Sequence, residues 1–246
     1  MRILLLFLFV FPVHAQASEW NYEIEPYLMA TSIDGDASMG RVTGIDLSVD
    51  MKRIMESLDM AAMVHFEALN DSGWGVILDY GFMDLSDDVS GARGGVVDAS
   101  LRQGVFEGML FKRQALTNGT LDYFGGVRWW DNDIEVEIDP AVLPGAIGTK
   151  IKEDWVDLVV GLRWRHQLNE NWQLNISGDI GGFGIDADLT SSVSLGAIFN
   201  INDRFSLDMR YKGTLVDYET GTRGVKGYYE YDTITHGPLL GLIIKL

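Results

Sequence analysis

The chain has 246 residues, and 36 acidic side chains outnumber 19 basic ones, which gives a formal net charge of −17. The negatively charged backbone of nucleic acid binds basic protein surfaces, so this excess of acidic residues excludes nucleic acid as an expected partner. No cysteine is present, so the fold must hold together without disulfide bonds, as a closed β-sheet can.

The first residues have the pattern of a secretory signal peptide. Arg2 supplies the positive start, Ile3 to Val13 form the apolar core, and Ala15-Gln16-Ala17 provides a small-residue cleavage site. We expect residues 1–17 to be removed and residues 18–246 to form one domain, because no linker or composition break divides them. No later apolar run reaches the roughly eighteen residues of a transmembrane helix.

The mature chain opens with an alternating segment, Asn21 to Ile33, which is predicted as a strand. It leads into a long insertion, Asp34 to Leu58, whose start, in the stretch IDGDASMG, is predicted as a loop. Within that insertion, apolar residues recur at helical spacing behind Ser48, a possible N-cap. A short amphipathic helix over residues 48–57 is therefore expected.

Further alternating segments bring the total to ten predicted strands, the later ones over residues 59–69, 74–85, 96–117, 121–138, 154–168, 172–185, 189–201, 205–217 and 228–246. Their connections alternate between short turns, at 70–73, 118–119, 169–171 and 202–204, and longer loops, at 34–58, 86–95, 139–153 and 218–227. Only the connection at 186–188 departs from this alternation.

Short turns on one side, long loops on the other and an even strand count predict an all-β fold. We expect a single closed antiparallel up-and-down transmembrane β-barrel with both termini in the periplasm. The alternative is a soluble barrel whose apolar set faces inward. It is disfavoured because the polar set is rich in Gly, Ser and opposite charges, unlike the Lys/Glu-rich coat of a soluble surface.

Two outward features fit this prediction. Aromatic residues follow short turns, where a periplasmic girdle would lie, namely Trp74, Tyr123, Trp172 and Phe205. The last strand places Leu242, Ile244 and Leu246 on its lipid-facing set.

The export signal, the alternating strands, the DIGGFG of Asp179 to Gly184 and the final HGPLLGLIIKL resemble the small outer-membrane β-barrel proteins of Gram-negative bacteria, the OmpA/OmpW-like group. The resemblance implies a location in the outer membrane, contact with its lipid and lipopolysaccharide, and assembly by the barrel-assembly machinery. That machinery reads a C-terminal strand that usually ends in an aromatic residue. Here Leu242, Ile244 and Leu246 would form the signal.

The inward polar set is the candidate functional region. It is predicted to form a mixed-charge network in the lumen that satisfies its own polar groups. The predicted members are Glu23, Glu25, Glu67, Asp79, Arg102, Asp122, Arg128, Asp157, Arg163, Arg165, Asp179, Asp208, Arg210 and Lys212. Such a lumen suits a structural barrel, and a narrow porin-like pore lined by the same residues is the second hypothesis.

An outer-membrane hydrolase is the third hypothesis. His65 and Glu67 share the inward face, where they could act as a base and its orienting partner, but no serine nucleophile motif accompanies them. No enzyme activity is therefore predicted.

No cofactor or metal is predicted either. Asp34-Gly35-Asp36 resembles part of a calcium loop but lacks the remaining ligands. The acidic loop residues are interpreted as a solvated rim, the alternative being that they hold divalent ions near lipopolysaccharide; they are Asp131, Asp133, Glu135, Glu137 and Asp139. A monomer is expected.

Overall fold

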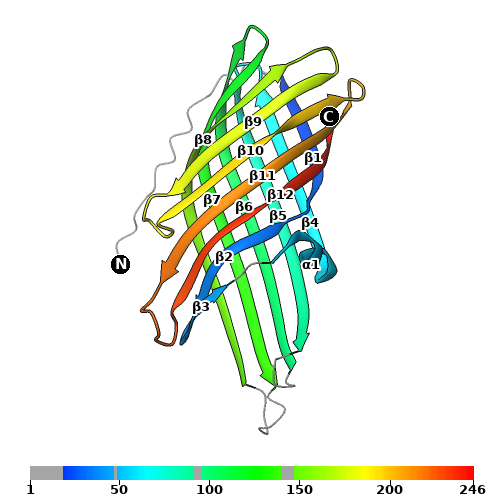
Figure 1. Ribbon diagram of the computed structural model, residues 1–246. Coiled ribbons are helices and arrows are strands. Elements are labelled where there is room, and N and C mark those ends of the chain that lie inside the picture. Colours follow the sequence, from blue (N-terminus) through cyan, green and yellow to red (C-terminus); the bar gives the residue numbers. More distant parts are fainter. Residues whose placement is uncertain (1–18, 47–48, 91–95, 140–146) are drawn as a thin grey trace, which may run out of the picture.

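A computed structural model describes residues 19–46, 49–90, 96–139 and 147–246, so the predicted signal peptide, residues 1–17, lies outside the described residues. The described chain is a closed antiparallel barrel of ten wall strands with one short helix, as predicted (Figure 1). Around the wall the strands run in the order β1, β4, β5, β6, β7, β8, β9, β10, β11 and β12, and β12 pairs with β1. No sheet edge is therefore left between the first and last strands.

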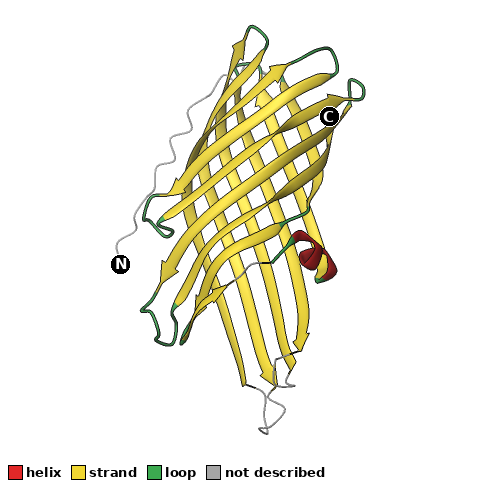
Figure 2. Cartoon of the chain, in the orientation of Figure 1, coloured by secondary structure: helices red, strands yellow, loops and turns green. Residues whose placement is uncertain are grey.

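The elements have the following bounds: β1 Trp20–Met29, β2 Ser32–Met39, β3 Val42–Asp46, α1 Met51–Glu56, β4 Leu58–Asn70, β5 Trp74–Ser90, β6 Val96–Leu116, β7 Gly119–Asp139, β8 Ile147–Gln167, β9 Trp172–Gly182, β10 Leu189–Asn200, β11 Phe205–Thr220 and β12 Tyr229–Lys245. Strands dominate the chain, as Figure 2 shows. Among the described residues, no helix is long and apolar enough to cross a membrane.

The barrel wall has one apolar and one largely polar face. Large apolar side chains on the outward set stay exposed around the wall, among them Leu28, Leu110, Val160, Val193, Leu195 and Leu240. Charged and hydroxyl side chains on the inward set are buried, among them Glu25, Asp122, Arg128, Ser194 and Asp208. This distribution is the reverse of a soluble protein's and matches a wall that faces lipid.

The two ends of the barrel differ in length. The short-turn end carries the tight connections after β4, β6, β8 and β10, together with the C-terminus (Figure 1). At the opposite, long-loop end, β5 to β8 run beyond the other strands (Figure 1). Each of β6, β7 and β8 has 21 residues. A membrane-spanning strand needs only about 9–11 residues, so these strands project well past the lipid.

The first wall strand is longer than predicted and is interrupted. β1 pairs with β12 as far as Met29, and β2 resumes pairing with the same strand at Ser32. The stretch IDGDASMG was predicted as a loop, and this prediction is wrong, since most of it forms β2, with β3 folding back on it. Gly35 permits this pairing. Its φ of 147° is one that residues with a side chain rarely adopt. A Cβ at this position would also collide with the carbonyl oxygen of Asp232.

The predicted helix exists but is shorter than residues 48–57. It begins at Met51, and the N-cap is Asp50 rather than Ser48, because the Asp50 carboxylate accepts a hydrogen bond from the backbone N–H of Arg53 at 2.9 Å. Ser48 itself lies outside the described residues.

Two predicted loops are also shorter than expected. β5 continues to Ser90, and β7 and β8 continue through Asp139 and from Ile147, so only residues 91–95 and 140–146 lie outside the described residues. The backbone of each extension is paired in register with its neighbour, as in Ser90 with Val96. Polar composition misled the prediction because the ladder satisfies the backbone whichever side chains it carries.

Candidate functional site in the barrel lumen

A cluster of two carboxylates and three guanidinium groups crosses the lumen in its short-turn half. Glu67 of β4 accepts from Arg113 of β6 and from Arg163 of β8, each at 2.7 Å, and lies 3.4 Å from Arg165. Asp122 of β7 accepts from Arg113 at 2.8 Å and from Arg163 at 2.7 Å. Strands β5, β6 and β7 separate β4 from β8 in the wall, so the Glu67–Arg163 pair spans the barrel interior.

An aromatic ring supports this cluster. Phe111 of β6 is buried, and the guanidinium carbons of Arg113 and Arg163 lie 5.3 and 5.6 Å from its ring centre. This distance suits a cation–π contact, which is stronger where water is excluded. Glu67 and Asp122 are therefore bound by guanidinium groups that the Phe111 ring helps to hold in place.

Two further charged groups fill the lumen beside this cluster. Arg210 of β11 binds Glu25 of β1 at 3.2 Å and Asp208 of its own strand at 2.7 Å. Arg128 of β7 binds Glu107 of β6 at 2.7 Å and Asp179 of β9 at 3.1 Å. Every one of these acidic groups has a basic partner, as burial of charge requires.

His65 joins the same network. Its Nδ1 lies 2.9 Å from a carboxylate oxygen of Asp79, and its Nε2 lies 3.9 Å from Glu67. The other Asp79 oxygen accepts a hydrogen bond from the Tyr27 hydroxyl at 2.8 Å. The imidazole is thus held between two carboxylates from neighbouring strands.

A second layer crosses the lumen nearer the long-loop end and consists of aromatic and amide groups. The rings of Trp155 of β8 and Tyr218 of β11 stack with centres 4.1 Å apart. The Asn132 amide of β7 donates to the hydroxyl of Tyr229 of β12 at 3.2 Å. Strands β8 to β11 lie between β7 and β12 in the wall, so this bond also joins opposite sides of the barrel.

Most of the predicted lumen residues lie in these networks. Glu25, Glu67, Asp79, Asp122, Arg128, Arg163, Arg165, Asp179, Asp208 and Arg210 all make the contacts described above. Asp157 is buried in the lumen but accepts from the Trp130 indole at 3.1 Å instead of pairing with a cation. Glu23 lines a small cavity beside Arg165, and Lys212 lines the pocket described below.

Arg102 is the member that the structure places elsewhere. Its side chain is 59% exposed and reaches Asp84 at 3.5 Å, on the opposite face of β6 from the buried Gln103. The inward cation and anion of this strand are Arg113 and Glu107, which were absent from the predicted lumen set. Both lie an even number of residues from Gln103 and therefore on the same face of β6. Counting alternate residues along the strand from Gln103 would have found them.

The predicted girdle residues lie at the short-turn end. Trp74, Trp172 and Phe205 begin β5, β9 and β11, and the side chains of Trp74, Tyr123 and Trp172 are exposed on the outer wall. Their role as a girdle stays a prediction. At the chain's end, Leu242 and Leu246 are exposed, and Ile244 pairs with Phe205 and Ile24.

Among the described residues, no group of three or more His, Asp or Glu side chains is arranged to hold a metal ion. Asp131 and Asp133 instead pair across the β7–β8 ladder with Lys152 at 3.4 Å and Lys150 at 3.3 Å. Lys150 also reaches Glu135 at 3.2 Å. The side chains of Glu137 and Asp139 lie outside the described residues.

No protein-family model matches the sequence, and no curated protein matches it. The chain is similar to solved structures. The outer-membrane protease OmpT from Escherichia coli matches with a TM-score of 0.58 and 9% identity, over 94% of this chain and 99% of that chain. The translocator domain of autotransporter NalP from Neisseria meningitidis matches with a TM-score of 0.39 and 10% identity, over 95% and 90%. Ail, the attachment invasion locus protein of Yersinia pestis, matches with a TM-score of 0.34 and 9% identity, over 93% and 99%.

At 9% identity the likeness to OmpT is one of fold, and it agrees with the closed strand order and the alternation of short turns and long connections. The exposed apolar wall is what lipid contact requires. The chain therefore has the fold of an outer-membrane β-barrel, with an apolar outer wall suited to lipid.

Proposed function

We propose that the protein is a structural barrel whose lumen passes no solute along the barrel axis. The observation that carries the proposal is that side chains from opposite walls bond to each other at two levels. Glu67 meets Arg163 at 2.7 Å in the charged layer, and Asn132 meets Tyr229 at 3.2 Å in the aromatic layer. Each contact places side chains across the path of a solute that moves along the axis.

The competing hypothesis is a narrow pore lined by the same charges. A pore needs its charged groups in contact with water along the axis. Arg128 is only 1% exposed and Asp122 is fully buried, and each is paired with oppositely charged groups. These contacts support the closed lumen.

Conductance in planar bilayers tests the proposal. We expect the native barrel to give no single-channel steps after its insertion has been checked by heat-modifiable migration in a detergent gel. An opened variant should give steps, because it removes one partner pair from each layer: Glu67→Ser and Arg163→Ser together with Asn132→Ala and Tyr229→Ala. Steps of similar size from the native protein would refute the closed lumen.

We also propose that the chain has no catalytic activity. The hydrolase hypothesis requires His65 and Glu67 to act on a bound substrate, but Glu67 already accepts from Arg113 and Arg163, and His65 is bound to Asp79. A lipid-hydrolase or protease activity that His65→Ala abolishes in a folded barrel would overturn this proposal.

For its place in the cell, we propose cleavage after Ala17, periplasmic termini, and a monomer surrounded by lipid and lipopolysaccharide. Support comes from the sequence pattern and from the exposed outward set of β12, which the barrel-assembly machinery would read through Leu242, Ile244 and Leu246. Protease treatment of whole cells checks the orientation. Cleavage near residues 91–95 with protection of the turn at Asn118 is expected, and the reverse pattern would contradict it.

A further inference from the structure

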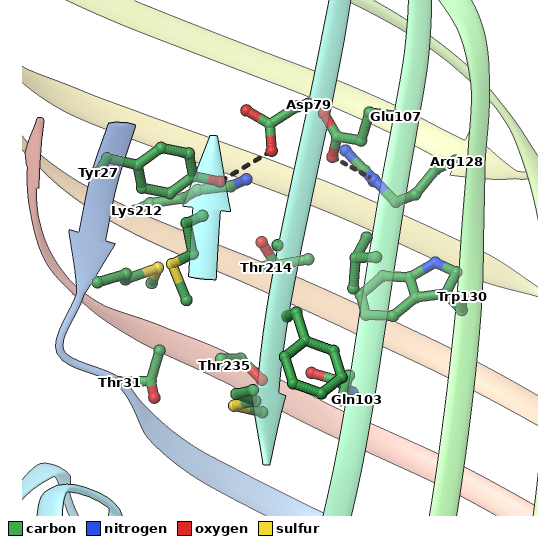
Figure 3. Close-up of a pocket in the computed structure, with 16 residues that line it drawn as sticks. Tyr27, Thr31, Asp79, Gln103, Glu107, Arg128, Trp130, Lys212, Thr214 and Thr235 are labelled. Atoms are coloured by element: carbon green, nitrogen blue, oxygen red, sulfur yellow. Dashed lines mark hydrogen bonds and ion pairs between the residues drawn. The ribbon is translucent and has the colours of Figure 1, made fainter. Parts of the chain in front are cut away.

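A pocket lies in the lumen between the two crossing layers. Its volume is about 100 Å³, and Arg128 and Glu107 from the charged layer and Gln103 and Trp130 from the aromatic layer all line it. Figure 3 shows Tyr27, Asp79, Glu107, Arg128 and Lys212 gathered at one end of the pocket, with Thr31, Thr235 and Gln103 at the other. The pocket is therefore a chamber within the lumen and not a channel along it.

The walls between these ends are apolar and adaptable. Met29, Met63 and Met83 line the pocket together with Val105 and Trp130. Methionine side chains are unbranched and polarizable, so they reshape around small ligands at low cost. An apolar wall with polar groups at its ends is the usual form of a small-molecule site.

One polar atom at the charged end lacks a partner. Arg128 is 1% exposed and uses Nε and Nη2 on Glu107 and Asp179, whereas its buried Nη1 has no hydrogen-bond acceptor among the described residues. Arg128 lines this end of the pocket, and a buried donor without an acceptor costs about 1–3 kcal/mol, so a ligand oxygen that reaches Nη1 would be stabilising.

Each carboxylate at this end already has a polar partner. Glu107 and Asp179 bind Arg128, and Asp79 is hydrogen-bonded to His65 and to the Tyr27 hydroxyl. A ligand with a net charge would add an uncompensated charge to a buried site, which is costly. The geometry thus favours a neutral ligand that offers an oxygen.

The strand pairing of the wall is interrupted beside this pocket. The β1–β4 pairing stops at Tyr27 with Met63, although β4 continues to Leu58 on its other side by pairing with β5. α1 covers the break. Its Ile54 packs in one buried cluster with Ile33 of β2 and Met83 of β5, and Met83 also lines the pocket.

We propose that this pocket binds a small neutral molecule with an apolar body and one acceptor oxygen, such as a short ketone, ester or ether, entering through the wall past α1. The volume sets the size. A cavity of about 150 Å³ accommodates benzene, so a smaller molecule is expected here. The proposal goes beyond the closed-lumen function and does not depend on it.

The test uses the barrel in detergent micelles with ¹³C-labelled methionine methyl groups. Titration with 2-butanone should shift the Met29, Met63 and Met83 signals saturably, with half-saturation in the millimolar range. The exposed Met55 and Met60 report partition into the micelle and should show no saturation. Pentane and propanoate have as many non-hydrogen atoms as 2-butanone, but one lacks the oxygen and the other carries a charge. Both should bind at least tenfold more weakly.

A space-filling variant completes the test. Gly81 lines the pocket, and a Cβ there would meet only the Tyr27 hydroxyl at 3.9 Å and the Met63 Cγ at 4.0 Å, so Gly81→Val should fill the pocket and abolish the saturable shifts. Gly178→Val is the matched control on another strand, where a Cβ would meet a single oxygen at 3.7 Å, and it should bind like the native protein.

The rate at which bound 2-butanone exchanges with free 2-butanone tests entry past α1. Ile54→Ala should speed exchange of bound 2-butanone at least threefold, and Met55→Ala should not. Equal exchange rates would overturn entry past α1. Unchanged methionine shifts at saturating 2-butanone, meaning that the pocket holds water only, would overturn the site. So would equal binding of the three probes, even if Gly81→Val fails to fold.

Discussion

Glu67 illustrates how a single carboxylate can determine the charge balance of the lumen. It lies within 3.4 Å of three guanidinium groups and is almost fully buried. Glu67→Gln would leave Asp122 alone to compensate Arg113 and Arg163. Breaking a buried pair from one side costs about 3–5 kcal/mol, so we expect a clearly lower unfolding temperature in heat-modification gels.

The control for this substitution is an exposed pair of similar chemistry. Glu56 lies 3.6 Å from Lys52 on α1, with both side chains largely exposed, and such pairs contribute less than about 1 kcal/mol. Glu56→Gln should leave the unfolding temperature unchanged. If both variants unfold at the same temperature, the Glu67 network is not what stabilises the lumen.

For single residues, the sequence predicts which face of a strand a side chain takes better than it predicts which partner that side chain meets. Alternation placed Glu67, Asp122 and Arg163 on the inward set, and all three side chains are buried, since successive residues of a strand point to opposite faces. The prediction was wrong on β6. Arg102 was assigned to the lumen but is exposed, whereas Glu107, on the opposite face of the strand, points into the lumen and was not assigned to it. Which cation meets which carboxylate could not be predicted, because partners such as Glu67 and Arg163 come from strands that are not neighbours.

α1 shows what an element adds to the wall. It is tied to β2 by the bond from the Met51 N–H to the Ser32 hydroxyl at 3.0 Å and to β5 by the bond from the Ser86 N–H to the Ser57 carbonyl at 2.9 Å. Ile54 is its one buried side chain. The helix therefore substitutes for strand pairing at the break between β1 and β4.

A matched pair of variants tests this role. Ile54 is 4% exposed and its neighbour Met55 is 61% exposed. Ile54→Ala should cost about 2–4 kcal/mol of local stability and speed amide hydrogen exchange over residues 51–57, while the barrel strands keep their protection. Met55→Ala should leave exchange unchanged. Faster exchange throughout β4 and β5 would instead mean that α1 holds the whole barrel together.

The insertion that contains α1 was only partly predictable. Helical spacing of apolar residues found the helix, but Asp50 replaced the expected cap, and the polar stretch from Ile33 became β2 and β3. A short polar sequence carries no sign that an existing strand, here β12, offers it a free edge. The same cause explains the extensions of β5, β7 and β8 into predicted loops.

At the scale of the whole molecule, alternation and turn spacing were enough to predict a closed barrel of ten wall strands. They could not predict whether its lumen is open. That depends on how the strands are staggered, and hence on whether Asn132 and Tyr229, or Trp155 and Tyr218, arrive at one level of the barrel.

We propose that both layers close the lumen, and planar-bilayer conductance tests this closure most directly. The native barrel, inserted and heat-modifiable, should give no single-channel steps, whereas the variant that removes Glu67, Arg163, Asn132 and Tyr229 should conduct. Native steps as large as those of the opened variant would contradict a closed lumen.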